Sequence, residues 1–106
     1  MRRPMHVHFP PEPFNAAVRD GSAGPKIQRL LEAIQPDAAY FSGHNGRRGG
    51  TFVVNVNSPS DVPALAEPFF LTFNAELEIR IAITPEELSR ASGRAGKEVG
   101  LGTATR

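Results

Sequence analysis

The sequence predicts an α+β fold, a ferredoxin-like βαββαβ sandwich with a four-stranded antiparallel sheet and two helices on one face. Three observations predict it. The expected elements follow one another as strand, helix, strand, strand, helix, strand. The strand segments alternate apolar and polar residues, and the helical segments have apolar residues three and four positions apart. The chain has 106 residues, 40% of them hydrophobic, which suffices for one core but not for two.

Residues 1–92 are expected to form this single domain, and residues 93–106 a basic, Gly-rich C-terminal tail. The formal net charge of +1 combines basic ends with an acidic middle, because residues 4–89 alone have a net charge of −4. We expect the basic ends, Arg2 and Arg3 among them, to lie outside the core. An acidic fold also argues against nucleic acid as a partner.

The sequence lacks signals for a membrane or for export. No apolar run approaches the length of a membrane span, and no apolar segment of a secretion signal follows the first arginines. The chain has no cysteine, so disulfides, thiolate metal ligands and thiol catalysis do not arise. We therefore expect a soluble, cytoplasmic protein with no membrane partner.

The first strand is expected over residues 5–9, where apolar residues alternate with histidines and two prolines follow. A short second strand is expected over 38–42, and a third over 51–57, which has the highest β-propensity in the chain. Asn45 and Gly46 lie between these two strands and are typical of a tight hairpin turn, because both accept a positive φ.

The apolar spacing over residues 14–34 predicts a helix, but Pro25 and nearby glycines interrupt it. We expect either one kinked helix or two pieces, the second with Ser22 as its N-cap. A later helix is expected to begin after Ser60 as N-cap and to end at Asn74, which tolerates the left-handed conformation.

The last strand is expected over residues 75–83, because four apolar residues alternate strictly with other residues there. These four are Leu77, Ile79, Ile81 and Ile83. Residues 84–87, "TPEE", have the pattern of a capping box with proline at the first helical position. A short helix is therefore expected to follow and to fade by Gly93.

Right-handed crossovers place the first and third strands in the centre of the sheet and the other two at its edges. Phe41 and the apolar residues of the last strand are expected to face the helices. The opposite face is expected to carry His6, His8, Tyr40, Val53, Asn55, Glu76, Glu78 and Arg80. Either this face is solvated, or a second subunit covers it and encloses a cavity.

Several segments resemble a group of small bacterial proteins that have no established activity. They are "PDAAYF", "NGRRGGTFVVNVNSPSDVPALAEPFFLTFNAELE" and "TPEEL", within residues 14–90, and the stretch Ala66–Glu78 is the most specific. The resemblance implies a ferredoxin-like subunit of the dimeric α/β-barrel type, in which two sheets face each other. Relatives often have a His-Pro pair after the glutamate of the last strand, whereas this chain has Arg80 and Ile81 there.

The polar face supplies the candidate site residues. A small-molecule ligand could bind there through His6, His8, Tyr40, Asn55, Glu78 and Arg80. The candidates for catalysis are Glu78, acting as a base, Arg80, holding an anionic substrate, and His8. The alternative is a ladder of charged and polar side chains on a solvated sheet.

Two further interpretations are weaker. His6, His8 and Glu78 could form a two-histidine, one-carboxylate metal site, but two histidines on one strand are also ordinary half-exposed residues, and we expect no metal and no cofactor. The segment "RRGGTFVV" partly matches an RNA-binding motif, yet Gly50 and Asn55 occupy positions where that motif needs aromatic residues.

The sequence therefore favours a homodimer that binds a small molecule at the polar face of its sheet. One alternative is a cofactor-free isomerase or monooxygenase, which rests on the analogy with dimeric α/β-barrels. A second is a purely structural or interaction module.

Overall fold

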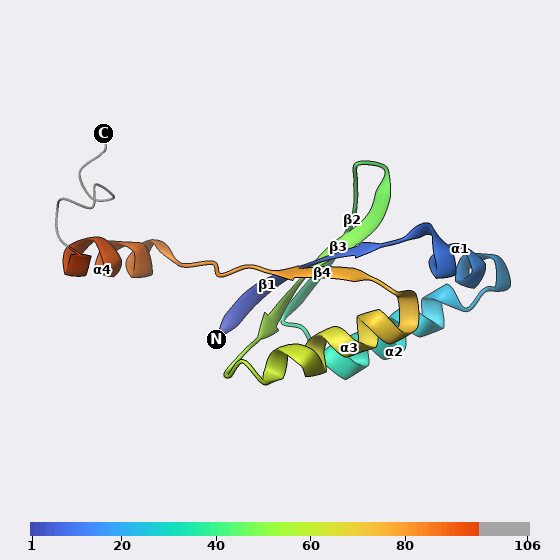
Figure 1. Ribbon diagram of the computed structural model, residues 1–106, viewed down its shortest axis with the longest axis horizontal. Coiled ribbons are helices and arrows are strands. Elements are labelled where there is room, and N and C mark those ends of the chain that lie inside the picture. Colours follow the sequence, from blue (N-terminus) through green and yellow to red (C-terminus); the bar gives the residue numbers. More distant parts are fainter. Residues whose placement is uncertain (96–106) are drawn as a thin grey trace.

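A four-stranded antiparallel sheet with the strand order β2-β3-β1-β4 forms the centre of the fold (Figure 1). The computed structural model describes residues 1–95, so most of the expected C-terminal tail lies outside the described residues. The strands are β1 (Arg2–Phe9), β2 (Ala38–His44), β3 (Arg47–Asn55) and β4 (Glu76–Ile79). The α+β class and the antiparallel sheet are confirmed, and the arrangement is compatible with a ferredoxin-like fold.

The helices are α1 (Pro11–Asp20), α2 (Ala23–Ile34), α3 (Asp61–Phe73) and α4 (Pro85–Ala95). The predicted interruption of the first helical segment is found at Gly21, which has φ = 82° and ends α1. Ser22 is the N-cap position of α2, as predicted, but its side chain makes no capping hydrogen bond. Asn74 ends α3 in the left-handed conformation, also as predicted.

One hydrophobic core joins the sheet to α1, α2 and α3. Its largest fully buried side chains are Met5, Val7, Phe52, Val54, Phe69 and Phe73. Aromatic rings from different elements pack against one another in this core. The ring centroids of Phe52 and Phe69 are 5.2 Å apart, and Phe14 stacks on Phe73 with 4.6 Å between centroids. The apolar positions of β1 all belong to this core, so its alternate residues point to the opposite face.

The last strand is shorter than predicted, because β4 ends at Ile79 rather than at residue 83. The backbone N–H of Arg80 still donates to the carbonyl of Pro4 at 3.1 Å, but proline has no N–H to return the bond. The ladder stops there. Ile81 is 79% exposed and Ile83 53% exposed, so the prediction that they pack under the helices is wrong.

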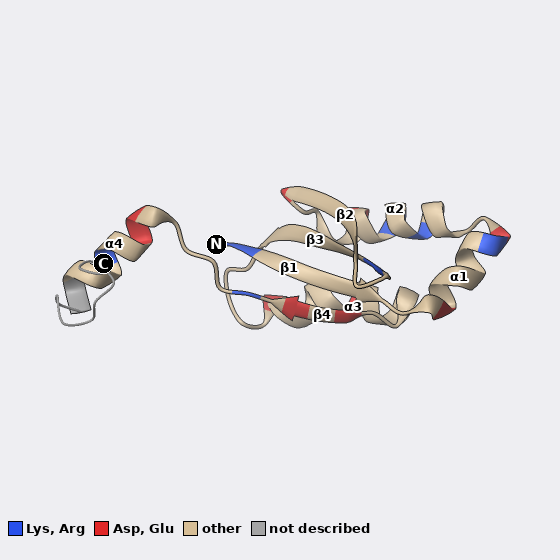
Figure 2. Cartoon of the chain, turned by 90° about the horizontal axis from the view of Figure 1, so that it is seen from above, with Lys and Arg blue, Asp and Glu red and all other residues tan. Residues whose placement is uncertain are grey.

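The basic N-terminal residues lie outside the core, as expected, but they also belong to the first strand. Arg2 and Arg3 are the first residues of β1, and the Arg2 Nε lies 3.1 Å from a carboxylate oxygen of Asp37. Figure 2 shows this basic end of β1 and the acidic residues along β4. The strand extends to Arg2 because β3 continues to Asn55 and supplies a paired partner for each of these residues.

The capping box of α4 is confirmed. The backbone N–H of Thr84 donates to the Glu87 carboxylate at 2.8 Å, and the backbone N–H of Glu87 donates to the Thr84 hydroxyl at 3.1 Å. An extended segment, residues 80–84, joins β4 to α4, and the helix lies apart from the sheet (Figure 1). Since no sheet covers α4, its first turn depends strongly on these two bonds.

We expect the first turn of α4 to lose stability in acid. The hydrogen bond from Thr84 lowers the pKa of Glu87 below its ordinary value of 4.5. A lowered pKa stabilises the folded helix above pH 4.5, and this contribution is lost as the pH falls through the lower pKa of the folded form. The ¹³Cα shifts of α4 followed by NMR against pH should show the loss.

Glu86→Gln is the matched control for this titration, because Glu86 is in the same turn but makes none of the capping bonds. It should retain the acid transition, whereas Glu87→Gln should remove it. A first turn whose shifts are constant between neutral pH and pH values well below 4.5 would contradict the capping role of Glu87.

Candidate functional site

The sheet face opposite the helices has a hollow of about 220 Å³ between β1, the β2–β3 hairpin and β4. We call it the polar site. Its polar side chains are His6, His8, Ser42, His44, Thr51, Glu78 and Arg80. Four of these residues, His6, His8, Glu78 and Arg80, are predicted site residues, and the structure brings them together.

Strand register positions the two central histidines. His6 lies between Thr51 of β3 and Glu78 of β4, and His8 lies between Gly49 and Glu76. Their neighbours along β1 are buried in the core, so alternation directs both imidazoles to the polar face. The pairing brings side chains distant in the sequence to one place on the sheet.

The polar site has room because Gly49 has no side chain. An ideal Cβ at this position would lie 2.6 Å from the Val7 carbonyl oxygen and 3.7 Å from the Nδ1 atom of His8. No side chain fits there without moving the backbone of β1. The absence of a side chain opposite His8 therefore opens the floor of the hollow.

His6 and His8 differ in their hydrogen bonding. The Nδ1 atom of His6 lies 3.0 Å from the Thr51 hydroxyl, which holds the ring. The Nδ1 atom of His8 is inaccessible to solvent and has no hydrogen-bond partner within the described part of the chain. A buried polar atom without a partner costs free energy, and the His8 ring must turn before this atom can bond to a molecule in the hollow.

Charged groups form the β4 side of the polar site. The Nη2 atom of Arg80 lies 3.3 Å from an oxygen of Glu78, and both side chains are largely exposed. An exposed pair of this kind contributes little stability. Arginine has five N–H donors, so most of those on Arg80 are left to meet an anion.

Two predicted residues lie elsewhere. Tyr40 is 64% exposed on the edge strand β2 and does not line the hollow. Asn55 lies at the other end of β3, where its side-chain amide donates to Asp37 at 3.3 Å. Both residues have the predicted strand assignment, but neither contributes to the polar site.

Three contributors to the polar site are missed by the sequence interpretation. His44 is expected as an isolated turn residue, yet it is the last residue of β2, with its ring 5.8 Å from that of His8. Ser42 and Thr51 also line the hollow. The signal that predicts them is the two-residue turn at Asn45 and Gly46, which pairs Ser42 with Gly49 and His44 with Arg47.

The proposed metal arrangement is not formed. Among residues 1–95, no three histidine, aspartate or glutamate side chains lie where they could together hold a metal ion. His6 is directed to Thr51 and Glu78 is directed to Arg80, so the three proposed ligands do not converge. The polar site is therefore better suited to hydrogen bonding than to coordination.

Comparisons with known proteins give no family. No protein-family model matches the chain, and no curated protein is significantly similar to it in sequence. The resemblance to the dimeric α/β-barrel type therefore stays a prediction. Within the part of the chain that the structure describes, no helix has both the length and the apolar character needed to cross a membrane.

Proposed function

We propose that this protein binds a small polar anion, in the size range of a hydroxy- or keto-carboxylate, at the polar site. The observation that supports this most strongly is that Arg80 and His8 border the same hollow, and that the buried Nδ1 atom of His8 has no partner among residues 1–95. A turn of the imidazole would bring this atom to the hollow, where a ligand oxygen or N–H would satisfy it. The ligand's carboxylate would meet the free donors of Arg80.

The volume of the polar site favours a small ligand. It holds about 220 Å³, below the range of about 300–1,000 Å³ that is typical of pockets for drug-sized molecules. The lining combines imidazoles and hydroxyls, which both donate and accept, with the guanidinium of Arg80, which only donates. A molecule with one carboxylate and one further oxygen matches that combination.

Binding is supported better than acid–base catalysis. Glu78, the candidate base, is largely exposed and forms an ion pair with Arg80. An effective general base is usually held in an environment that tunes it for proton transfer. We therefore give Glu78 the role of orienting Arg80 and assign the ligand contact to Arg80 and His8.

We propose further that a second copy of the chain covers the polar face, so that the protein is a homodimer. None of α1, α2 and α3 covers this face, because their apolar residues belong to the core on the other side. The polar site in one chain is open to solvent along that face. Covering it would exclude water and strengthen each bond between the ligand and the site.

The test is titration calorimetry of the whole protein with lactate, malate, pyruvate, oxaloacetate and, separately, inorganic phosphate. At least one carboxylate should bind at millimolar concentration or below. His8→Ala and Arg80→Ala should each weaken that binding about tenfold or more, as expected for a lost bond to a charged ligand.

Arg29→Ala is the matched control, because Arg29 is an exposed residue of α2 outside the polar site. It should leave the affinity unchanged. Failure of the whole carboxylate panel to bind, or equal binding by wild type and His8→Ala, would overturn the proposal. Light scattering of the same samples should give the mass of two chains, and the mass of one chain would contradict the proposed homodimer.

A further inference from the structure

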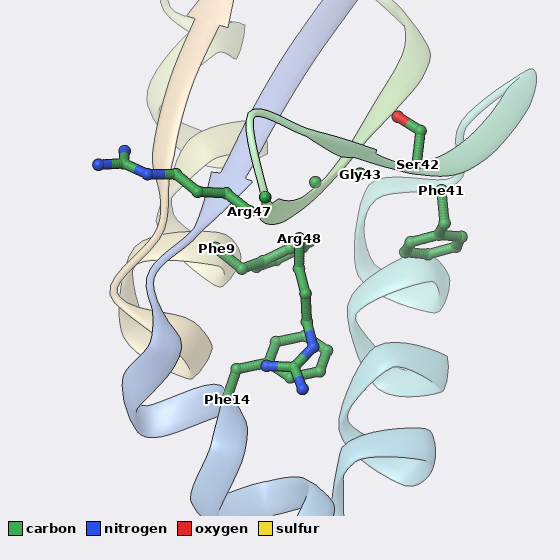
Figure 3. A pocket seen from close by; sticks show the side chains of 9 residues that line it. Phe9, Phe14, Phe41, Ser42, Gly43, Arg47 and Arg48 are labelled. Carbon is green, nitrogen blue, oxygen red and sulfur yellow. The ribbon is translucent and has the colours of Figure 1, made fainter.

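A second cavity lies on the other side of the β2–β3 hairpin. It has a volume of about 540 Å³, and we call it the apolar pocket. Figure 3 shows its walls, which are the rings of Phe9, Phe14 and Phe41 and the side chain of Arg48. The cavity faces the helix side of the sheet, whereas the polar site opens on the opposite face.

The walls come from four elements that meet beneath the hairpin. Phe9 ends β1 and packs against Phe14 of α1, with 5.2 Å between ring centroids. Phe41 of the edge strand packs edge-on against the core residue Phe52 at 5.4 Å, but it stays 51% exposed. Phe41 therefore lies on the predicted face but is only half covered, which leaves an aromatic surface open to the pocket.

Arg48 is held in place at the pocket by an aromatic ring and a side-chain amide. Its guanidinium carbon lies 4.6 Å from the centroid of the Phe14 ring, a cation–π arrangement, and its Nη1 atom donates to the Asn15 side chain. Among the described residues, no ion pair involves Arg48. Its remaining N–H groups therefore form a fixed donor set beside an apolar cavity.

We infer that the apolar pocket binds an aromatic carboxylate. The ring of such a ligand would pack on the half-exposed ring of Phe41, with the buried rings of Phe9 and Phe14 behind it, and its carboxylate would contact the guanidinium of Arg48. The volume of about 540 Å³ lies inside the range of about 300–1,000 Å³ that is typical of small-molecule pockets. The charge of Arg48 selects an anion, and the aromatic walls select a flat apolar body.

This inference is independent of the ligand proposed for the polar site. The two cavities share hairpin residues as a common wall, but the polar site is lined by imidazoles and hydroxyls, and the apolar pocket by aromatic rings. The lining of the polar site is mostly polar, so it is a poor match for a bicyclic aromatic ring. The ligands of the two cavities can therefore be distinguished by their chemistry.

The experiment is a titration of the full chain with 2-naphthoate, read from the ligand's own fluorescence and from amide shifts in NMR. Binding should shift the amides around Phe14 and Phe41 and leave those of His6 unchanged. The uncharged 2-naphthamide should bind about tenfold more weakly or worse, because it cannot form a charge-assisted bond to Arg48.

Arg48→Ala should weaken 2-naphthoate binding about tenfold or more. Arg47→Ala is the matched control, since it removes the same charge from a neighbouring residue that also lines the pocket but whose guanidinium extends away from the Phe14 ring (Figure 3). It should change the affinity less than threefold, and His8→Ala should leave it unchanged. Arg48→Lys, which keeps the charge but loses the planar guanidinium, should be intermediate.

Three results would overturn the inference. They are equal binding of the acid and the amide, equal effects of Arg47→Ala and Arg48→Ala, and amide shifts at His6 rather than at Phe14. An unchanged amide spectrum of unliganded Arg48→Ala would exclude misfolding as the cause of lost binding. If that variant misfolds, the comparison of 2-naphthoate with 2-naphthamide on the wild-type chain still decides the question.

Discussion

Replacing Phe52 with alanine should lower the free energy of unfolding by about 3–5 kcal/mol. The Phe52 side chain is 0% exposed and lies between the rings of Phe41 and Phe69, so it connects the edge strand β2 to helix α3. Removing the ring loses its burial and leaves a cavity that the surrounding aromatic rings cannot close. Urea denaturation followed by circular dichroism measures the change.

Leu71→Ala is the control for this experiment. Leu71 is also a large apolar residue and lies in α3, but it is 78% exposed. It should change the free energy of unfolding by less than about 0.5 kcal/mol. Small domains are stable by only about 5–15 kcal/mol, so Phe52→Ala removes a large share of the total. Equal effects of the two substitutions would contradict the position of the core.

Gly49→Ala should lower the free energy of unfolding by about 1–3 kcal/mol. Its new Cβ would lie 2.6 Å from the carbonyl oxygen of Val7, and a backbone atom in the middle of a paired strand cannot move aside cheaply. The methyl group would also enter the polar site 3.7 Å from the His8 Nδ1 atom. We therefore expect lower stability together with weaker binding of the carboxylate.

Gly24→Ala separates this steric effect from the general effect of replacing a glycine. Gly24 lies in α2, and an added Cβ would have nothing within 4 Å. The substitution should change the free energy of unfolding by less than about 0.5 kcal/mol, because the helix preference of alanine is opposed by Pro25, which disfavours the helical conformation of the residue before it. Thermal unfolding should therefore occur at a clearly lower temperature for Gly49→Ala and at nearly the wild-type temperature for Gly24→Ala, and equal shifts for the two variants would contradict this reasoning.

The sequence predicts the sheet face on which a residue lies better than it predicts which residues lie next to it. Alternation in β1 places His6 and His8 on the polar face, since every second residue there is buried. Alternation does not say where along the face a residue lies, which is why Tyr40 and Asn55 share the predicted face but lie outside the polar site. The distance along a strand depends on register, and register depends on the partner strand.

The length of the last strand shows the same limit. The alternation of Ile79, Ile81 and Ile83 is that of a paired strand, yet pairing needs a partner that can return hydrogen bonds. Only the register shows that Pro4 is the residue facing Arg80. The alternation in the last strand and the proline in the first strand do not, by themselves, predict that the ladder ends at the pair Pro4 and Arg80.

The apolar pocket also exists because the helix layer only partly covers the edge strand β2. Phe41 alternates as a residue that faces the helices, and it does contact Phe52. β2 is nevertheless at the edge of the sheet, where no helix covers the ring completely. The sequence predicts the direction of that side chain, but not the open space beside it.

The most direct test of carboxylate binding at the polar site is the ¹⁵N NMR shift of the His8 imidazole, followed while the protein is titrated with the carboxylate that binds best in calorimetry. If the His8 ring turns and its Nδ1 atom, which has no partner among the described residues, bonds to the ligand, that nitrogen should shift by more than the Nδ1 atom of His6, which Thr51 already holds. An Nδ1 shift of His8 that stays constant to saturation would contradict the polar site as the place of binding.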